Sequence, residues 1–237
     1  SLFGMALNFQ IKANHIQISY YLAIIIFCYA IGLFIWLVAD KERRHGIAKF
    51  FAASALLLTI GIIGIGANAN KLIPTYNYSK HTMRGGSELA VESSENSGKT
   101  KGLDLEYATA WSYGWQELPN MMIPDFNGGA SSGAVNYSKS ETIKLLKQYG
   151  QPNLREVAKT LPLYWGPQPF TAGPMYMGAI TIFLFILGLF MCKGRDKWWI
   201  LAATVIAVLL GVGNHFMPFT KFWYYYMPFY SKFRTVS

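Results

Sequence analysis

Acidic residues and cysteines are both scarce in this chain. Asp and Glu number 12 against 21 Lys and Arg, and charged residues make up only 14% of the 237 positions. The two cysteines are far apart, at Cys28 and Cys192, and no His or Cys spacing is typical of a zinc site. Low charge with 52% hydrophobic residues is typical of a membrane protein. The composition therefore excludes a disulfide scaffold and argues against a zinc site.

The positive charge gives no support to a nucleic-acid partner. The chain has a net charge of +9, but the basic residues outside the polar middle of the chain mostly flank apolar blocks. A nucleic-acid-binding protein would instead cluster them along one face or one helix. We therefore expect membrane lipid, and no nucleic acid, as the partner of these charges.

Four apolar blocks without Asp, Glu, Lys or Arg predict an all-α polytopic integral membrane protein. The blocks are expected as transmembrane helices at 16–39, 50–69, 172–192 and 198–217. The first block alone would rise roughly 36 Å as a helix, more than the ~30 Å hydrocarbon core requires. Around them we expect an outer end of a preceding span at 1–15, short linkers at 40–49 and 193–197, a long loop at 70–171 and an interfacial segment at 218–237. The chain is thus expected to be an internal fragment of a longer protein.

The two short linkers carry more basic charge than the short segments on the other side. The linkers hold seven basic residues: Lys41, Arg43, Arg44, Lys49, Lys193, Arg195 and Lys197. The opposite segments hold four: Lys12, Lys221, Lys232 and Arg234. By the positive-inside rule the linkers face the cytosol, so the loop 70–171 is expected outside it.

Short elements are expected within the long loop. A strand is predicted near Tyr76 to Tyr78, and helical spacing runs from Leu105 through Trp115 to a stop at Pro119. Ser138 and Glu141 have capping-box spacing ahead of ETIKLLKQYG, with Gly150 as the stop signal. Pro152 is expected to open a second short helix, NLREVAKT.

Polar residues gather where the first apolar block begins, in the segment NHIQISYY. His15, Gln17 and Tyr20 are candidate substrate-binding residues there, because polar groups that enter a bilayer are costly unless they face protein or water. His15 is also a weak candidate for proton transfer. An interfacial cap with a belt of tyrosines explains the same residues equally well.

Two further sets of residues are candidates for chemistry. Lys80, Arg84 and Arg234 could bind a lipid-linked phosphate, although attraction to anionic headgroups accounts for them about as well. Asp125, in the segment IPDFNGG, could act as a general base or bind a divalent cation as a possible cofactor. An ordinary turn is the better explanation of that segment.

Several segments in order resemble one known family. They are ANHIQISYY, TYNYSKHTMRGGSEL, GLDLEYATAWSYGWQELPNMMIPDFNGGASSG, YWGPQPFTAGPMYMGAI and FYSKFRTVS. Together they cover nearly the whole chain and resemble the YfhO-like membrane proteins of Bacteroidetes. Members of that family are much longer, with about a dozen spans.

The resemblance implies a glycosyltransferase of the GT-C type in the bacterial inner membrane. Such an enzyme takes a sugar from a polyprenyl-phosphate donor and transfers it to an extracytoplasmic envelope polymer or protein acceptor. Such enzymes usually rely on an acidic residue in the first outer loop as the catalytic base. That loop is expected to be outside this chain, so the resemblance assigns no catalytic base to a residue of this sequence. A flippase for lipid-linked sugars and a non-catalytic subunit of an envelope complex are the alternatives.

Overall fold

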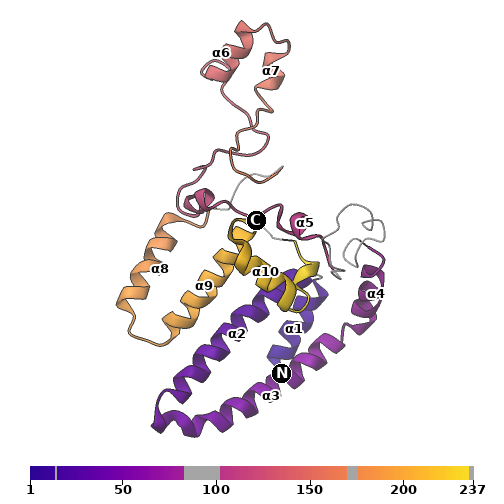
Figure 1. Cartoon of the computed structure of the whole chain (residues 1–237), viewed down its shortest axis with the longest axis vertical. Coiled ribbons are helices and arrows are strands. Elements are labelled where there is room, and N and C mark those ends of the chain that lie inside the picture. The colour runs from indigo at the N-terminus through magenta and orange to yellow at the C-terminus, as the bar shows by residue number, and fades with distance from the viewer. Residues whose placement is uncertain (14, 83–101, 170–175, 235–237) are drawn as a thin grey trace. The chain divides into compact units, whose positions relative to one another are not determined.

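The structure, a computed structural model, describes residues 1–13, 15–82, 102–169 and 176–234 (Figure 1). Within these ranges the regular elements are helices, and extended pairing is limited to two isolated bridges, Gly128 with Tyr164 and Gly133 with Leu161. The chain divides into two compact units. The first unit comprises 1–104, 188–208 and 227–233, and the second comprises 105–187, 209–226 and 234–237.

The first unit begins with a series of helices, of which α2 and α3 are strongly apolar. They are α1 (Leu2–Lys12), α2 (Ile16–Val38), the 3-10 helix η1 (Lys41–Gly46), α3 (Ile47–Gly66) and α4 (Ala69–Ser79). The predicted first span at 16–39 is therefore a single helix, as expected. The second block also forms a helix, which starts three residues earlier than predicted and ends at Gly66, before the break at Asn68.

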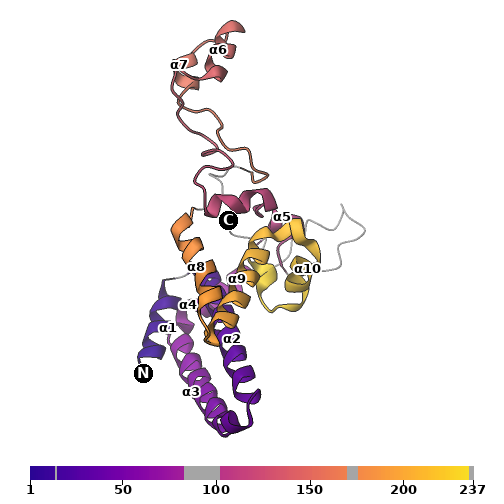
Figure 2. The same cartoon turned by 90° about the vertical axis from the view of Figure 1, so that its left-hand side faces the viewer.

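Helix α1 lies alongside α3, and glycine permits a close approach of the two backbones (Figure 2). A Cβ atom at Gly64 would lie 2.9 Å from the carbonyl oxygen of Gly4, and one at Gly4 would lie 2.8 Å from Cγ2 of Ile60. Small residues at helix interfaces are a general feature of membrane packing. Asn68 adds a polar contact, because its buried Nδ2 donates to Oδ1 of Asn8 at 2.6 Å. The glycine-rich end of the second apolar block thus serves packing.

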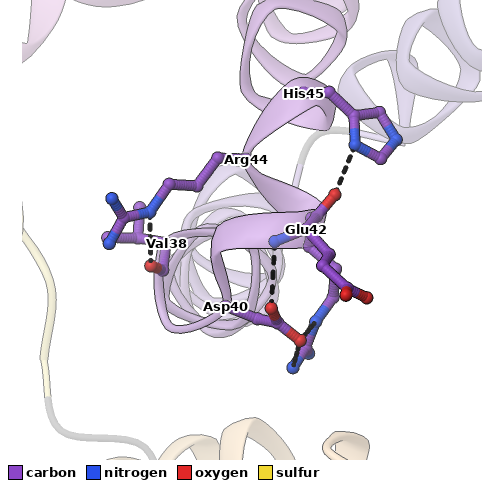
Figure 3. A network of polar contacts seen from close by, with 6 residues as sticks. Val38, Asp40, Glu42, Arg44 and His45 are labelled. Carbon is purple, nitrogen blue, oxygen red and sulfur yellow. Dashed lines mark hydrogen bonds and ion pairs between the residues drawn. The ribbon is translucent and has the colours of Figure 1, made fainter.

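Two short segments join the helices at one end of the first unit. Asp40 caps η1 by accepting from the backbone N–H of Glu42 at 3.0 Å, while Nε of Arg44 donates to the carbonyl of Val38 at 3.2 Å (Figure 3). The second segment precedes α9 (Asp196–Val212). Its Arg195 lies 4.1 Å from the ring centre of Trp36, and Arg43 of the first linker lies 4.3 Å from the same ring. Both linkers are therefore at the same end of this unit.

The second unit contains shorter elements. They are α5 (Leu105–Thr109), η4 (Trp115–Met121), α6 (Glu141–Gln148), α7 (Leu154–Val157), η5 (Gly213–Phe216) and α10 (Met217–Tyr226); α8 (Ala179–Met191) and α9 contribute residues to both units. Backbone contacts tie η5 to the segment after α5. The N–H of Tyr113 donates to Gly211 O at 2.8 Å, and the N–H of Asn214 donates to Oγ of Ser112 at 3.0 Å.

Three helical stretches are long and apolar enough to cross a membrane: Ile16–Val38, Lys41–Gly66 and Asp196–Tyr226. In α2 only 11% of the most apolar window is buried within the chain, so most of this surface is available to lipid or to other protein segments. Such apolar surfaces indicate a membrane protein. The block predicted as a span at 172–192 is described only as α8, whose 13 residues rise about 20 Å, less than a bilayer core. A fourth span stays a prediction.

Three local predictions in the long loop are wrong. The strand expected near Tyr76 to Tyr78 is helical, since these residues lie in α4, which also contains Pro74. The expected helix from Leu105 to Trp115 is interrupted, because α5 ends at Thr109, where its hydroxyl donates back to the carbonyl of Leu105. Pro119 does not end a helix but lies inside η4.

The N-cap of α6 differs from its prediction, whereas its first residue, Glu141, and its stop signal agree. Ser140, not Ser138, is the N-cap and accepts from the N–H of Ile143. The hydroxyl of Ser138 instead donates to Oδ1 of Asn136 in a tight turn. Gly150 follows the helix with φ +70°, which is the left-handed conformation expected of a stop signal.

Candidate functional site

Two lysines flank the ring of Tyr76 in the first unit. Nζ of Lys80 lies 4.7 Å from the ring centre and Nζ of Lys232 lies 5.0 Å from it. Lys80 is one turn further along the chain from Tyr76, whereas Lys232 comes from the distant η6 (Tyr230–Lys232). We call Tyr76, Lys80 and Lys232 the lysine collar. Ammonium groups that lie on an aromatic face can still bind an anion.

Aromatic contacts place the neighbourhood of the collar at one end of α2. The ring centre of Tyr20 lies 5.2 Å from Phe233 and 6.4 Å from Tyr230, the residues on either side of Ser231 and Lys232. Tyr20 is in the first turns of α2, and Trp36, beside the linkers, is near its last. Sixteen residues of helix separate these two by about 24 Å. The collar therefore belongs to the end of the first unit that is remote from the linkers.

Tyr230 is almost completely buried in this cluster. Burial raises the pKa of its hydroxyl above the ordinary value of 10.0, and the nearby Tyr21 and Tyr20 raise the pKa further. Tyr230 therefore remains a neutral hydroxyl at physiological pH. Its role next to Lys232 is to pack and position η6.

Two other candidate substrate-binding residues, His15 and Gln17, lie at the start of α2. His15 is exposed and occupies the N-cap of α2, but its side chain makes no capping bond. Gln17 donates through Nε2 to the hydroxyl of Tyr21 one turn later, at 3.0 Å. These contacts agree with the alternative of an interfacial cap with a tyrosine belt.

The predicted basic residues are not gathered in one place. Lys80 lies in the collar, but Arg84 lies outside the described residues. Arg234 belongs to the second unit, where its guanidinium carbon is 4.0 Å from the ring centre of Trp111. Lys80 is thus linked to Tyr20 through Tyr76 and the segment around Lys232. Arg234 makes a separate cation–π contact.

Asp125 occupies an exposed turn. Its φ is +54°, and its carbonyl accepts from the N–H of Gly128 at 2.9 Å. Aspartate tolerates the left-handed conformation that such turns require. Among the described residues no group of three His, Cys, Asp or Glu side chains could hold a metal ion. This geometry supports the role of Asp125 in forming the turn, and its candidacy as a general base or cation ligand stays a prediction.

The second unit contains a fully buried carboxylate at Glu117. Oε2 accepts from the N–H of Gly114 at 2.7 Å, and Oε1 accepts from the hydroxyl of Tyr164. Burial and the bond to this carboxylate raise the pKa of Tyr164 well above its ordinary range. Gly166 must lack a side chain, because a Cβ there would collide with both Tyr164 and Glu117. These residues hold the segment at 114–117 against the one at 164–168.

A second polar group is buried close to this pair. Gln168 is 4% exposed, and its backbone N–H donates to the hydroxyl of Tyr164 at 3.2 Å. Within the described ranges neither Oε1 nor Nε2 of its side chain has a hydrogen-bond partner. On the other side of Glu117, Nδ2 of Asn120 donates to Oδ1 of Asn127 at 2.8 Å. The cluster is a polar core that fixes the loop.

No family model, curated protein or solved structure matches this chain.

Three residues of these clusters were not predicted from the sequence as site residues. Tyr76 was assigned to a strand, Tyr230 was one aromatic residue among many, and Glu117 is a single carboxylate in a polar segment. The signal for Tyr76 and Lys80 is their i, i+4 spacing, which brings them together only on a helix. The pairing of Glu117 with Tyr164 spans 47 residues and has no local signature.

Proposed function

We propose that this chain is part of a multi-pass bacterial inner-membrane glycosyltransferase of the GT-C type. It would transfer a sugar from a polyprenyl-phosphate donor to an extracytoplasmic acceptor, with the loop 70–171 outside the cytosol. The lysine collar is the observation that carries the proposal. The resemblance to YfhO-like proteins supplies the type of reaction.

The collar suits the phosphate of a lipid-linked donor for two reasons. It offers two ammonium groups, on Lys80 and Lys232, at 4.7 and 5.0 Å from one ring. It also belongs to the end of α2 where tyrosines cluster, as they do at the level of lipid headgroups. Cationic groups there would stabilise the negative charge that grows on the departing phosphate. A carboxylate from outside these residues would then deprotonate the acceptor hydroxyl.

The test is sugar transfer by the intact gene product in liposomes that contain a polyprenyl-phosphate sugar. We expect Lys80→Gln with Lys232→Gln to lower the rate at subsaturating donor by about tenfold or more, because each cation near a membrane surface contributes roughly 1 kcal/mol. The matched control is Lys139→Gln with Lys159→Gln, which removes the same charge from exposed positions of the second unit. The control should transfer at the wild-type rate.

Arg234→Ala provides a second test, since its planar guanidinium is suited to a bidentate phosphate contact. We expect it to abolish transfer while membrane insertion is unchanged. Normal transfer in both the Arg234 and the lysine variants would contradict the assignment of these residues. If the wild-type protein binds the donor but transfers no sugar, the proposed glycosyltransferase activity is contradicted. A flippase or a non-catalytic subunit is then favoured.

A further inference from the structure

The two linkers of the first unit are held together by one tryptophan. Trp36 lies in the last turn of α2, and the guanidinium carbons of Arg43 and Arg195 lie over its ring at 4.3 and 4.1 Å. Cation–π contacts of this length are favourable even at exposed sites. The sequence predicted that both linkers lie on one side of the membrane, and Trp36 brings their arginines to a single point.

This point carries a surplus of positive charge. The linkers 40–49 and 193–197 together hold seven Lys and Arg against three acids, which are Asp40, Glu42 and Asp196. Lys41, Lys49 and Lys193 are exposed, and Lys197 is half-buried with its Nζ donating to the carbonyl of Leu189 at 3.2 Å. The net charge of the two linkers therefore remains positive even when each of the three acids is paired with a base.

The two arginines retain donors beyond those used inside the chain. Asp40 accepts from Nε of Arg43 at 2.9 Å and lies 2.7 Å from one terminal nitrogen. Asp196 approaches Nε of Arg195 at 3.5 Å. A guanidinium has five N–H donors, so each arginine can still present a pair to a planar or tetrahedral anion. Both side chains are one-third exposed, which leaves those donors accessible.

From this geometry we propose that the Trp36–Arg43–Arg195 cluster binds the phosphate of an anionic phospholipid headgroup. The ring holds one guanidinium from each linker within 4.3 Å of its centre, at the end of a membrane-length apolar helix, where lipid phosphates are found. Basic pockets between helix ends are a general form of headgroup recognition. The site is distinct from the lysine collar and does not depend on glycosyl transfer.

A lipid phosphate fits better than a free phosphate because of what surrounds the cluster. Helices α2 and α3 leave Ile35 60% exposed and Phe51 56% exposed. Ile35 is the neighbour of Trp36 in α2, and Phe51 lies about one turn after η1 in α3. Both side chains would contact acyl chains beneath the headgroup. A free anion has no group to cover them.

Native mass spectrometry of the purified chain in detergent tests the proposal. The chain is titrated with phosphatidylglycerol, phosphatidylcholine or soluble glycerol phosphate. We expect binding of phosphatidylglycerol only, and about a tenfold loss of its affinity in the double variant Arg43→Gln/Arg195→Gln. The control Lys139→Gln/Lys159→Gln should bind it like the wild type.

Two further variants separate the cluster from general attraction and from folding. Trp36→Leu keeps every charge but removes the ring, and we expect about a fivefold loss of affinity. Arg43→Lys/Arg195→Lys keeps the charges, and it should bind more tightly than the Gln variant when both have wild-type helix content by circular dichroism. The proposal would be overturned by any of three results. Phosphatidylcholine or glycerol phosphate could bind as tightly as phosphatidylglycerol, or the variant Arg43→Gln/Arg195→Gln could bind phosphatidylglycerol with wild-type affinity.

Discussion

At the scale of single residues, the pair Glu117 and Tyr164 shows how a buried charge is accommodated. In the described part of the chain no Lys, Arg or His lies within salt-bridge distance of Glu117, which is 0% exposed. A buried carboxylate without a counter-ion requires strong hydrogen bonds. The hydroxyl of Tyr164 and the N–H of Gly114 supply them. Tyr164 should therefore contribute more to stability than its size suggests.

Tyr164→Phe tests this contribution. We expect the variant to lose roughly 1.5 to 3 kcal/mol of the free energy of unfolding at pH 8, because hydrogen bonds to charged groups have that magnitude. Urea titration in detergent, followed by tryptophan fluorescence, measures the difference. Tyr149→Phe removes a hydroxyl from an 80% exposed ring and serves as the control. A variant as stable as the wild type would show that the bond to Glu117 contributes nothing.

The same pair predicts a dependence on pH. The pKa of Tyr164 is raised in the folded protein above the ordinary 10.0, so the unfolded chain loses this proton at lower pH than the folded one. The stability from this group is complete below pH 10 and decreases as the pH rises above it. The difference between wild type and Tyr164→Phe should accordingly narrow above pH 10. A difference that stays constant up to pH 11 would contradict the raised pKa.

Residue types alone did not separate functional from structural positions. Asp125 and Glu117 are both single carboxylates in a polar loop, yet one lies in an exposed turn and the other is fully buried. The difference arises from a contact 47 residues away along the chain, which no local pattern encodes. His15 was a candidate because a polar residue preceded an apolar block, a pattern that an interfacial cap shares.

At the scale of elements, the long apolar helices were predicted best. Helix α2 matches its apolar block to within one residue, because the block must be as long as the bilayer is thick. Short helices in the loop depend on capping and on distant contacts, so α5, η4 and the N-cap of α6 were mispredicted. Helix α4 was missed because Tyr and Thr around Pro74 suggested extended structure.

The two serines before α6 provide a direct test of capping. Ser140→Ala should destabilise α6 by about 1 kcal/mol, since it removes the side-chain oxygen that accepts from Ile143. Hydrogen exchange of the Ile143 amide measures the loss. Ser138→Ala lacks this effect because its hydroxyl bonds to Asn136 in the preceding turn. The reverse ranking would restore Ser138 as the cap.

At the scale of the whole molecule, the positive-inside rule predicts which side of the membrane the linkers face. Trp36 brings both linkers to one end of the first unit, which agrees with a hairpin arrangement. The cysteines offer a probe, because Cys192 is exposed next to the second linker and Cys28 is buried. Labelling of a native thiol can therefore report on the linker side.

We expect a membrane-impermeant maleimide to label Cys192 in inverted vesicles but not in intact cells, as the positive-inside rule requires. Tyr78→Cys in a Cys192→Ala background should show the opposite behaviour, since Tyr78 is 73% exposed in α4. Cys192→Ala alone is the control and should remain unlabelled. Labelling of Cys192 in intact cells would invert the orientation.

The contact of Trp36 with Arg195 also has a consequence for the order of events during synthesis. Arg43 is made almost together with Trp36, whereas Arg195 follows it by 159 residues, the difference of the two residue numbers. At about 5 to 20 residues per second the ribosome needs roughly 10 to 30 seconds to add them. During that interval we expect the hairpin of α2 and α3 to have one arginine on its tryptophan. Once Arg195 is made, the second linker can join it, and a change in the fluorescence of Trp36 would report that contact.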